Sequence, residues 1–155
     1  MFGVPIDAWY TWLGLSIASV ALVGVAAALP TAPPPAATDA AGTVDRTAAT
    51  AHPATAKHPL DARAIRVEPE GIGLRNDAGT AHATFAFGPV TPVSGSDPLT
   101  AILHGAPPGT RFTSGEALCA AGRRARDRPP RWRSAEGQLV VRHVVWEGCD
   151  VTLVG

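Results

Sequence analysis

Neither sign of charge dominates this sequence. Thirteen basic and thirteen acidic residues cancel over 155 residues. Lysine is nearly absent, since twelve of the thirteen basic residues are arginine and Lys57 is the remaining one. With no net charge there is no overall field to attract nucleic acid or another polyanion. We therefore predict that the protein has no nucleic-acid partner.

Short catalytic motifs are also missing. The chain has no G-x-S-x-G, no H-E-x-x-H and no glycine loop that could cradle a phosphate. His82 and His143 fall on predicted strands, and a hydrolase using one of them is the weakest of three functional hypotheses. The prediction is a protein that is not an enzyme and has neither a cofactor nor a metal.

Cysteine is scarce. Cys119 and Cys149 lie thirty residues apart and have no metal-ligand spacing, and two cysteines are too few for a structural zinc site. Two alternatives remain. The pair forms a disulfide if this part of the chain lies outside the cytoplasm, or the two are separate small core residues.

One long run is free of charged side chains. Residues 9–29 read WYTWLGLSIASVALVGVAAAL, which as a helix spans about 31 Å and matches the ~30 Å hydrocarbon core of a bilayer. Trp9, Tyr10 and Trp12 at its start are typical of a membrane-interface belt. The run predicts a single-pass transmembrane helix after a tail of residues 1–8, with the lipid bilayer as partner.

Two questions about this segment stay open at the sequence level. A cleaved signal peptide is the alternative to a retained anchor, although residues 1–8 contain no basic residue and the run is longer than a usual signal core. Orientation is also undecided. The first basic residue after the segment is Arg46, and this positive charge favours a C-terminal domain on the cytoplasmic side of the membrane. A proline-rich stalk instead favours a C-terminal domain on the outer side. We predict a cell-membrane protein with its C-terminal domain outside the cell.

Residues 30–59 are rich in proline, alanine and threonine and have almost no large apolar side chain. Pro33, Pro34 and Pro35 favour an extended polyproline II spacer. A short helix near residues 40–51 is conceivable, but it has too little apolar surface to dock firmly. The prediction for residues 30–59 is a linker.

Residues 60–155 predict a small α+β domain. Alternating apolar and polar residues, separated by turn signals, predict strands, and a capping box formed by Thr113 and Glu116 predicts one helix. The expected strands cover residues 64–68, 72–75, 80–87, 99–103, 139–145 and 151–154, and the expected helix covers residues 115–126. The fold class is thus an antiparallel β-sheet with one helix on a face, preceded by a transmembrane helix and a linker.

Residues 122–133, GRRARDRPPRWR, concentrate positive charge. One hypothesis is an anion-binding site for a ligand or a lipid surface, and the alternative is a solvated helix end whose cations complement the helix dipole. A single interleaved tryptophan is too few for a base-stacking platform. The candidate anion-binding residues are Arg123, Arg124, Arg126, Arg128, Arg131 and Arg133.

Three segments carry a family resemblance: VPIDAWYTWLGLSIASVALVGVAAALPTAPPP, NDAGTAHATFAFGPVTPV and VVWEGCDVTLVG. Through them the chain resembles an uncharacterised haloarchaeal family of small single-span membrane proteins associated with type IV pilus-like assembly genes. The resemblance implies a pilin-like or pilus-accessory role. The chain departs from the haloarchaeal pattern because its net charge is neutral rather than strongly acidic. It departs from a processed pilin because Pro5, Ile6, Asp7 and Ala8 do not provide the basic and small residues of a prepilin cleavage site.

The functional hypotheses are therefore ordered. The first is a non-enzymatic, membrane-anchored surface protein that serves as a pilin-like or accessory subunit of a pilus or secretion assembly, with other assembly proteins as partners. The second is a membrane-tethered binding module whose arginine cluster recognises an anionic ligand or lipid surface. The tethered hydrolase comes third.

Overall fold

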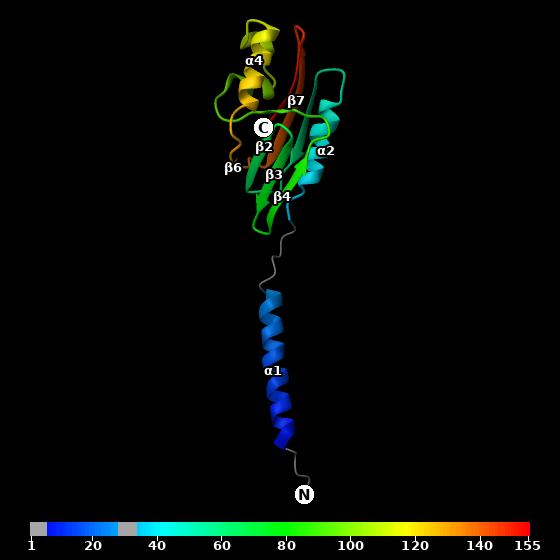
Figure 1. Cartoon of the computed structure of the whole chain (residues 1–155), viewed down its shortest axis with the longest axis vertical. Coiled ribbons are helices and arrows are strands. Elements are labelled where there is room, and N and C mark those ends of the chain that lie inside the picture. Colours follow the sequence, from blue (N-terminus) through cyan, green and yellow to red (C-terminus); the bar gives the residue numbers. More distant parts are fainter. Residues whose placement is uncertain (1–5, 28–33) are drawn as a thin grey trace. The chain divides into compact units, whose positions relative to one another are not determined.

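The computed structural model describes residues 6–27 and 34–155, with the side chains of the first helix from Trp9 to Gly24. The chain divides into two compact units, and helix α1 (Ile6–Ala27) belongs to the first (Figure 1). The second unit contains α2 (Ala37–Ala48), β1 (Ala54–Pro59), β2 (Ala64–Glu68), β3 (Gly71–Asn76), β4 (Gly79–Thr84), β5 (Thr91–Pro92), α3 (Pro98–Leu103), a 3-10 turn (Pro108–Thr110), α4 (Gly115–Arg126), β6 (Arg133–Ser134), β7 (Gln138–Trp146) and β8 (Cys149–Val154).

Helix α1 corrects the prediction of a transmembrane anchor. Within the described residues no helix combines the length and the apolar character needed to cross a membrane. The single-pass, signal-anchor assignment of residues 9–29 is therefore wrong for the described chain. Residues 1–5 of the predicted tail, and residues 28 and 29, lie outside that part.

The prediction of a linker at residues 30–59 is also corrected, because most of this segment is folded. Helix α2 and strand β1 occupy residues 37–48 and 54–59. One side of α2 is fully buried through small side chains: Ala37, Thr43, Thr47, Ala40, Ala41 and Val44. Asp45 accepts hydrogen bonds from the backbone N–H groups of Ala86 and Phe87, at 2.9 and 3.0 Å, which joins α2 to the chain after β4. A helix needs no large residues to dock when alanine lets its backbone approach a sheet closely.

The predicted single sheet is in fact two four-stranded sheets. Sheet A has the strand order β1-β7-β8-β5, and sheet B has the order β4-β3-β2-β6. All pairs are antiparallel except β5 with β8, which is parallel. The α+β class holds, but the domain has helices α2 and α3 in addition to the predicted α4.

Strands β7 and β8 of sheet A contribute buried side chains on both faces. Leu139 and Val141 of β7 belong to an inner core with Ile65 and Leu74 of sheet B and with α2. Val140 and Val144, which point the other way, belong to an outer core with α3 and α4. Because successive side chains of a strand alternate between faces, β7 must be apolar at nearly every position. The order of layers is α3 and α4, then sheet A, then sheet B, and α2 contacts β1 and β4 at one edge (Figure 1).

Two local expectations also changed. Residues 99–103 form helix α3 rather than a strand, because Asp97 caps its start by accepting from the N–H of Leu99, and Pro98 occupies the first turn. Helix α4 has the predicted bounds, but its N-cap is Ser114, whose hydroxyl accepts from the N–H of Ala117, and not Thr113.

The start of α4 requires glycine at position 115. A Cβ there would collide with the backbone carbonyl of Glu147 and would lie 2.7 Å from that of Trp146. By contrast, a Cβ at Gly122 inside α4 would lie 3.5 Å from its nearest neighbours, which is ordinary contact. Helix α4 therefore approaches the β7–β8 turn as closely as a glycine allows.

We predict opposite effects for two alanine substitutions in α4. Gly115→Ala lowers the free energy of unfolding by about 1–3 kcal/mol, because the backbone has to move apart. Gly122→Ala raises it by about 0.5–1 kcal/mol, because alanine favours the helix and the space exists. Urea unfolding followed by circular dichroism measures both, and equal effects of the two variants would contradict the packing described for Gly115.

Candidate functional site

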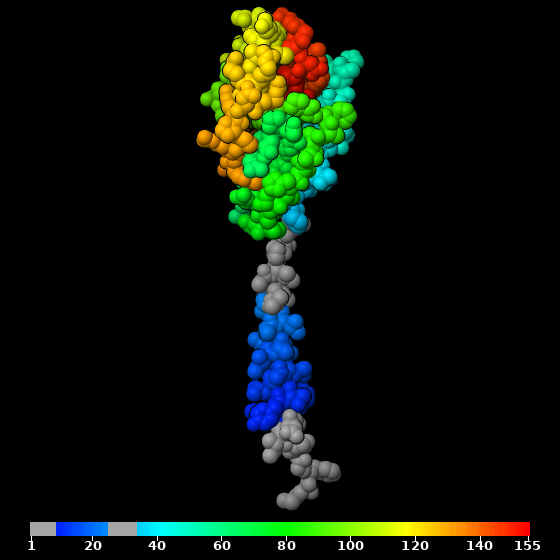
Figure 2. Space-filling model, in the orientation of Figure 1, coloured from blue at the N-terminus to red at the C-terminus, as the bar shows by residue number. Residues whose placement is uncertain are grey.

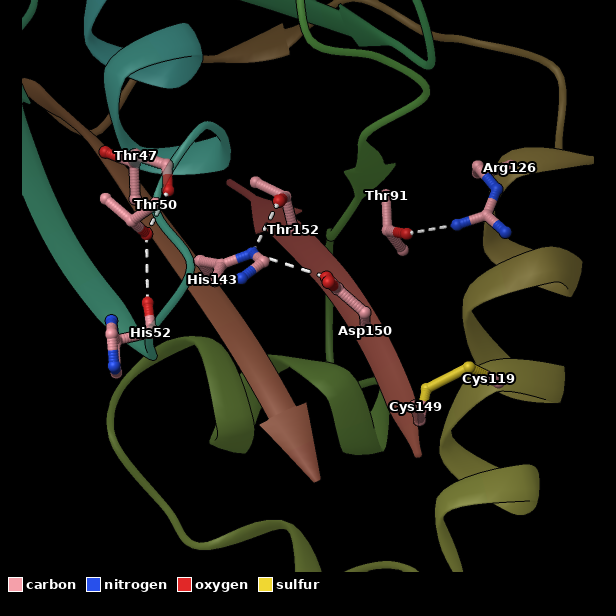
Figure 3. Close-up of polar contacts among 10 residues, drawn as sticks. All are labelled: Thr47, Thr50, His52, Thr91, Cys119, Arg126, His143, Cys149, Asp150 and Thr152. Atoms are coloured by element: carbon pink, nitrogen blue, oxygen red, sulfur yellow. Dashed lines mark hydrogen bonds and ion pairs between the residues drawn. A yellow bond between two sulfur atoms is a disulfide. The ribbon is translucent and has the colours of Figure 1, made fainter. Parts of the chain in front are cut away.

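The six candidate arginines do not form one cluster. Arg123 and Arg124 lie exposed in the last turn of α4, where positive charge complements the negative end of the helix dipole. Arg126, also in that turn, donates a hydrogen bond from Nη1 to the hydroxyl of Thr91 in β5 at 2.7 Å (Figure 3). Arg123 and Arg124 thus match the solvated helix end, and Arg126 links α4 to the edge of sheet A.

The arginines after the helix lie against a groove. The segment that follows α4 lies beside the β2–β3 strands on the face shown in Figure 2. Here Arg128, Arg131 and Arg133 line a groove of about 450 Å³. Its other walls are Val67, Pro69, Pro92, Val93, Ser94, Ala125, Pro129 and Trp132. The structure therefore brings together three of the six predicted residues.

These three guanidinium groups differ in their surroundings. Arg128 pairs with Asp97, the N-cap of α3, with 2.8 Å between Nη1 and Oδ2. Arg131 is exposed. Arg133 on β6 is half-buried, and its Nη2 is buried with no hydrogen-bond partner among the described residues. Burial lowers the pKa of Arg133 below its usual value, and Glu136 opposes this by favouring the charged form.

Trp132 shapes the far side of the same segment. Its ring lies beneath two guanidinium groups, with the Cζ of Arg75 4.3 Å and the Cζ of Arg66 5.3 Å from the ring centroid. The ring packs where β3 has Gly73, since a Cβ there would lie 3.0 Å from the indole. Arg66 and Arg75 were not among the site residues predicted from the sequence. A glycine in the middle of an alternating strand was the pattern that could have indicated a side chain covering that position.

The histidines do not assemble a hydrolytic site. His143 is buried, and its Nδ1 lies 3.2 Å from the hydroxyl of Thr152 and 3.5 Å from the carboxylate of Asp150 (Figure 3). A catalytic histidine needs its orienting carboxylate on one ring nitrogen and a nucleophile at the other. In His143 both partners face Nδ1, and Nε2 is buried without a hydrogen-bond partner among the described residues. His82 packs edge-on against Trp132, with 6.1 Å between the ring centroids.

Comparison with protein families gives one match. A family of unknown function, DUF7283, matches residues 3–144. The chain belongs to this family. No curated protein and no solved structure matches the chain. Membership of DUF7283 therefore assigns no chemistry to the arginines, to the groove or to helix α1.

The two cysteines form a disulfide in this DUF7283 protein. Cys119 of α4 is joined to Cys149 at the start of β8, with 5.7 Å between the Cα atoms (Figure 3). Cys149 is buried in the outer core, and Cys119 packs against it. The bond holds α4 on the outer face of sheet A.

The aromatic residues predicted as a membrane-interface belt lie near the start of α1. Trp9, Tyr10 and Trp12 are about two-thirds exposed, at 66 %, 66 % and 69 %. They belong to a run of exposed apolar side chains along α1.

We predict that the disulfide contributes substantially to the stability of residues 34–155. Replacing both cysteines by alanine lowers the free energy of unfolding by about 3–4 kcal/mol, because the unfolded chain is no longer closed across the thirty-residue separation. Chemical unfolding of the oxidised protein and of the double variant measures the difference. Dithiothreitol is the control, since it destabilises the wild-type protein and leaves the double variant unchanged. A double variant as stable as the oxidised protein would contradict this role.

Proposed function

We propose that this DUF7283 protein is a non-enzymatic subunit or accessory protein of a pilus-like or secretion assembly at the cell surface, of the haloarchaeal kind that its sequence resembles. In this proposal helix α1 packs against the α1 helices of further copies of the chain. The disulfide-bonded unit of residues 34–155 is displayed outside the cell and makes the protein contacts of the assembly.

The observation that carries the proposal is the exposure of α1. Its large apolar side chains between Trp9 and Val23 are from 47 % to 72 % exposed. The hydroxyls of Ser16 and Ser19 donate to the backbone carbonyls of Trp12 and Leu15, at 2.9 and 2.8 Å, so these polar groups are satisfied within the helix. A helix that is apolar on every side is buried in its working state, and an exposed apolar surface of this extent marks an interaction site.

Two features favour another copy of the same helix as the partner. The sequence has no charged residue between Asp7 and Asp39, so identical helices meet without repulsion between like charges. Gly14, Ala18 and Ala21 share one side of the helix, and a Cβ at Gly14 would meet nothing within 4 Å. Small residues at a contact reduce the distance between helix axes, which increases the packing between two copies.

The disulfide supports the compartment in this proposal. A bond between Cys119 and Cys149 would be reduced in most cytoplasms, whereas the outer surface of a cell maintains it. Display of residues 34–155 outside the cell is consistent with this chemistry. It also agrees with the role implied by the family resemblance, in which a helix assembles the subunit and a folded domain faces the surroundings.

Co-purification of two differently tagged copies tests the proposal. Both copies are full-length chains, expressed together, and one tag is used to recover the other. We expect the second copy to be recovered with the first. Gly14→Leu combined with Ala18→Leu in both copies reduces the recovery by about fivefold or more, because bulky side chains then separate the helices.

Ser16→Leu is the matched control. At about 100° per residue, position 16 lies on the opposite side of α1 from Gly14. This variant makes the same change from a small to a large residue but leaves the side with Gly14 and Ala18 intact, so recovery stays close to that of the wild-type chain. The proposal fails if the two copies never co-purify, or if the double variant and the control reduce recovery equally.

A further inference from the structure

We propose that the groove at the β5–β6 edge binds an organic monocarboxylate with an apolar body, through the guanidinium group of Arg133. The ligand class includes free small acids and the C-terminal carboxylate of a peptide, which share this chemistry. The proposal concerns residues 34–155 and is independent of how α1 assembles.

The groove exists because the two edges of the β-sandwich are closed differently. At one edge α2 contacts β1 and β4 and covers the inner core. At the other edge the two outermost strands, β5 and β6, have only two residues each and belong to different sheets. The chain between α4 and β6 passes over this edge, and the groove lies between that chain and the walls formed by β2 and β5.

The charge in the groove is suited to a single carboxylate. The positive charge of Arg128 is compensated by Asp97. Arg133 has no ion-pair partner within 4.0 Å among the described residues, and its Nη2 is buried without a hydrogen bond. Burying a cation without a partner is costly. Nη2 itself is enclosed by protein, so a carboxylate in the groove pairs with the rest of the guanidinium and offsets part of that cost through short, charge-assisted hydrogen bonds. Glu136 moderates the positive field near Arg133, which disfavours a ligand with two or more negative charges.

The walls of the groove are suited to an apolar body next to that carboxylate. Val67, Pro69, Pro92 and Val93 form an apolar part of its lining. The volume of about 450 Å³ is within the range of small-molecule sites, which are mostly apolar with a few placed polar groups. Inorganic anions would gain nothing from these walls, whereas an acid with an aromatic or aliphatic body uses both parts of the groove.

Titration calorimetry with 3-phenylpropionate on the full-length protein tests the proposal. We expect a dissociation constant of about 1 mM or lower, which is reasonable for a ligand of this size. The neutral isostere 3-phenylpropanamide and inorganic phosphate bind at least about tenfold more weakly. Arg133→Gln weakens the binding of 3-phenylpropionate by about 10- to 100-fold, because a charge-assisted hydrogen-bonded pair is lost.

Two further variants separate binding from folding. Arg123→Gln removes the same charge from an exposed position on α4 outside the groove, and binding stays within about twofold of wild type. Arg133→Met abolishes binding while the melting temperature stays equal to that of the wild-type protein or rises, because an unpaired buried charge is replaced by an apolar side chain of similar length. A retained melting temperature shows that the loss of binding is not a loss of fold.

The source of the carboxylate is decided by a second pair of ligands. N-acetyl-Ala-Phe with a free C-terminus is compared with its C-terminal amide. Tighter binding of the free peptide than of 3-phenylpropionate assigns the groove to peptide C-termini, and the reverse assigns it to small acids. The proposal is overturned if 3-phenylpropionate does not bind, if 3-phenylpropanamide or phosphate binds equally well, or if Arg133→Gln leaves the affinity unchanged.

Discussion

The burial of β7 and β8 on both faces is the constraint on which the rest of the domain depends. The inner side chains of these strands need sheet B and α2, and the outer ones, among them Val140, Val144 and Val151, need α3 and α4. A sheet covered on one face only would expose half of these residues to water. The position of α4 follows from this requirement. The disulfide, the glycine at position 115 and the hydrogen bond from Arg126 to Thr91 then hold α4 against the sheet.

The candidate groove follows from the same arrangement. Once α4 lies over β8, the chain has to return past the edge of the sandwich to reach β6, because β6 pairs with β2 in the other sheet. This return carries Arg128, Arg131 and Arg133 over a weakly closed edge. Asp97 compensates the positive charge of Arg128. The side chain of Arg133 is left half-buried, and its Nη2 has no hydrogen-bond partner among the described residues. A run of arginines that looks uniform in the sequence therefore contains residues at a helix end, residues paired within the fold and residues that line the groove.

Parts of the fold could be predicted because they depend on neighbours in the sequence. Helix α4 and the β7–β8 hairpin have strong local patterns and were found with nearly correct bounds. Helix α2 was missed because its buried side consists of alanine, threonine and one valine, which look like linker composition until a sheet is present to pack against. Helix α3 was mistaken for a strand because the apolar run of residues 99–103 is too short for its periodicity to distinguish a helix from a strand. The N-cap at Asp97, which indicates a helix, was overlooked. The transmembrane prediction rested on the uncharged run of residues 9–29, whereas no helix within the described residues is long and apolar enough to cross a membrane.

The sequence by itself determined the α+β class, the uncharged apolar run near the N-terminus and the concentration of arginine at residues 122–133, although it assigned the apolar run wrongly to a membrane. Each depends on composition or on short-range periodicity, which the chain carries without its fold. Only the tertiary structure decided that Cys119 meets Cys149, that Arg66 and Arg75 stack on Trp132, and that Arg133 alone of the six arginines has a buried nitrogen with no partner among the described residues. These relations join residues far apart in the chain, and distance in space is set by the packing of two sheets, which no local pattern encodes.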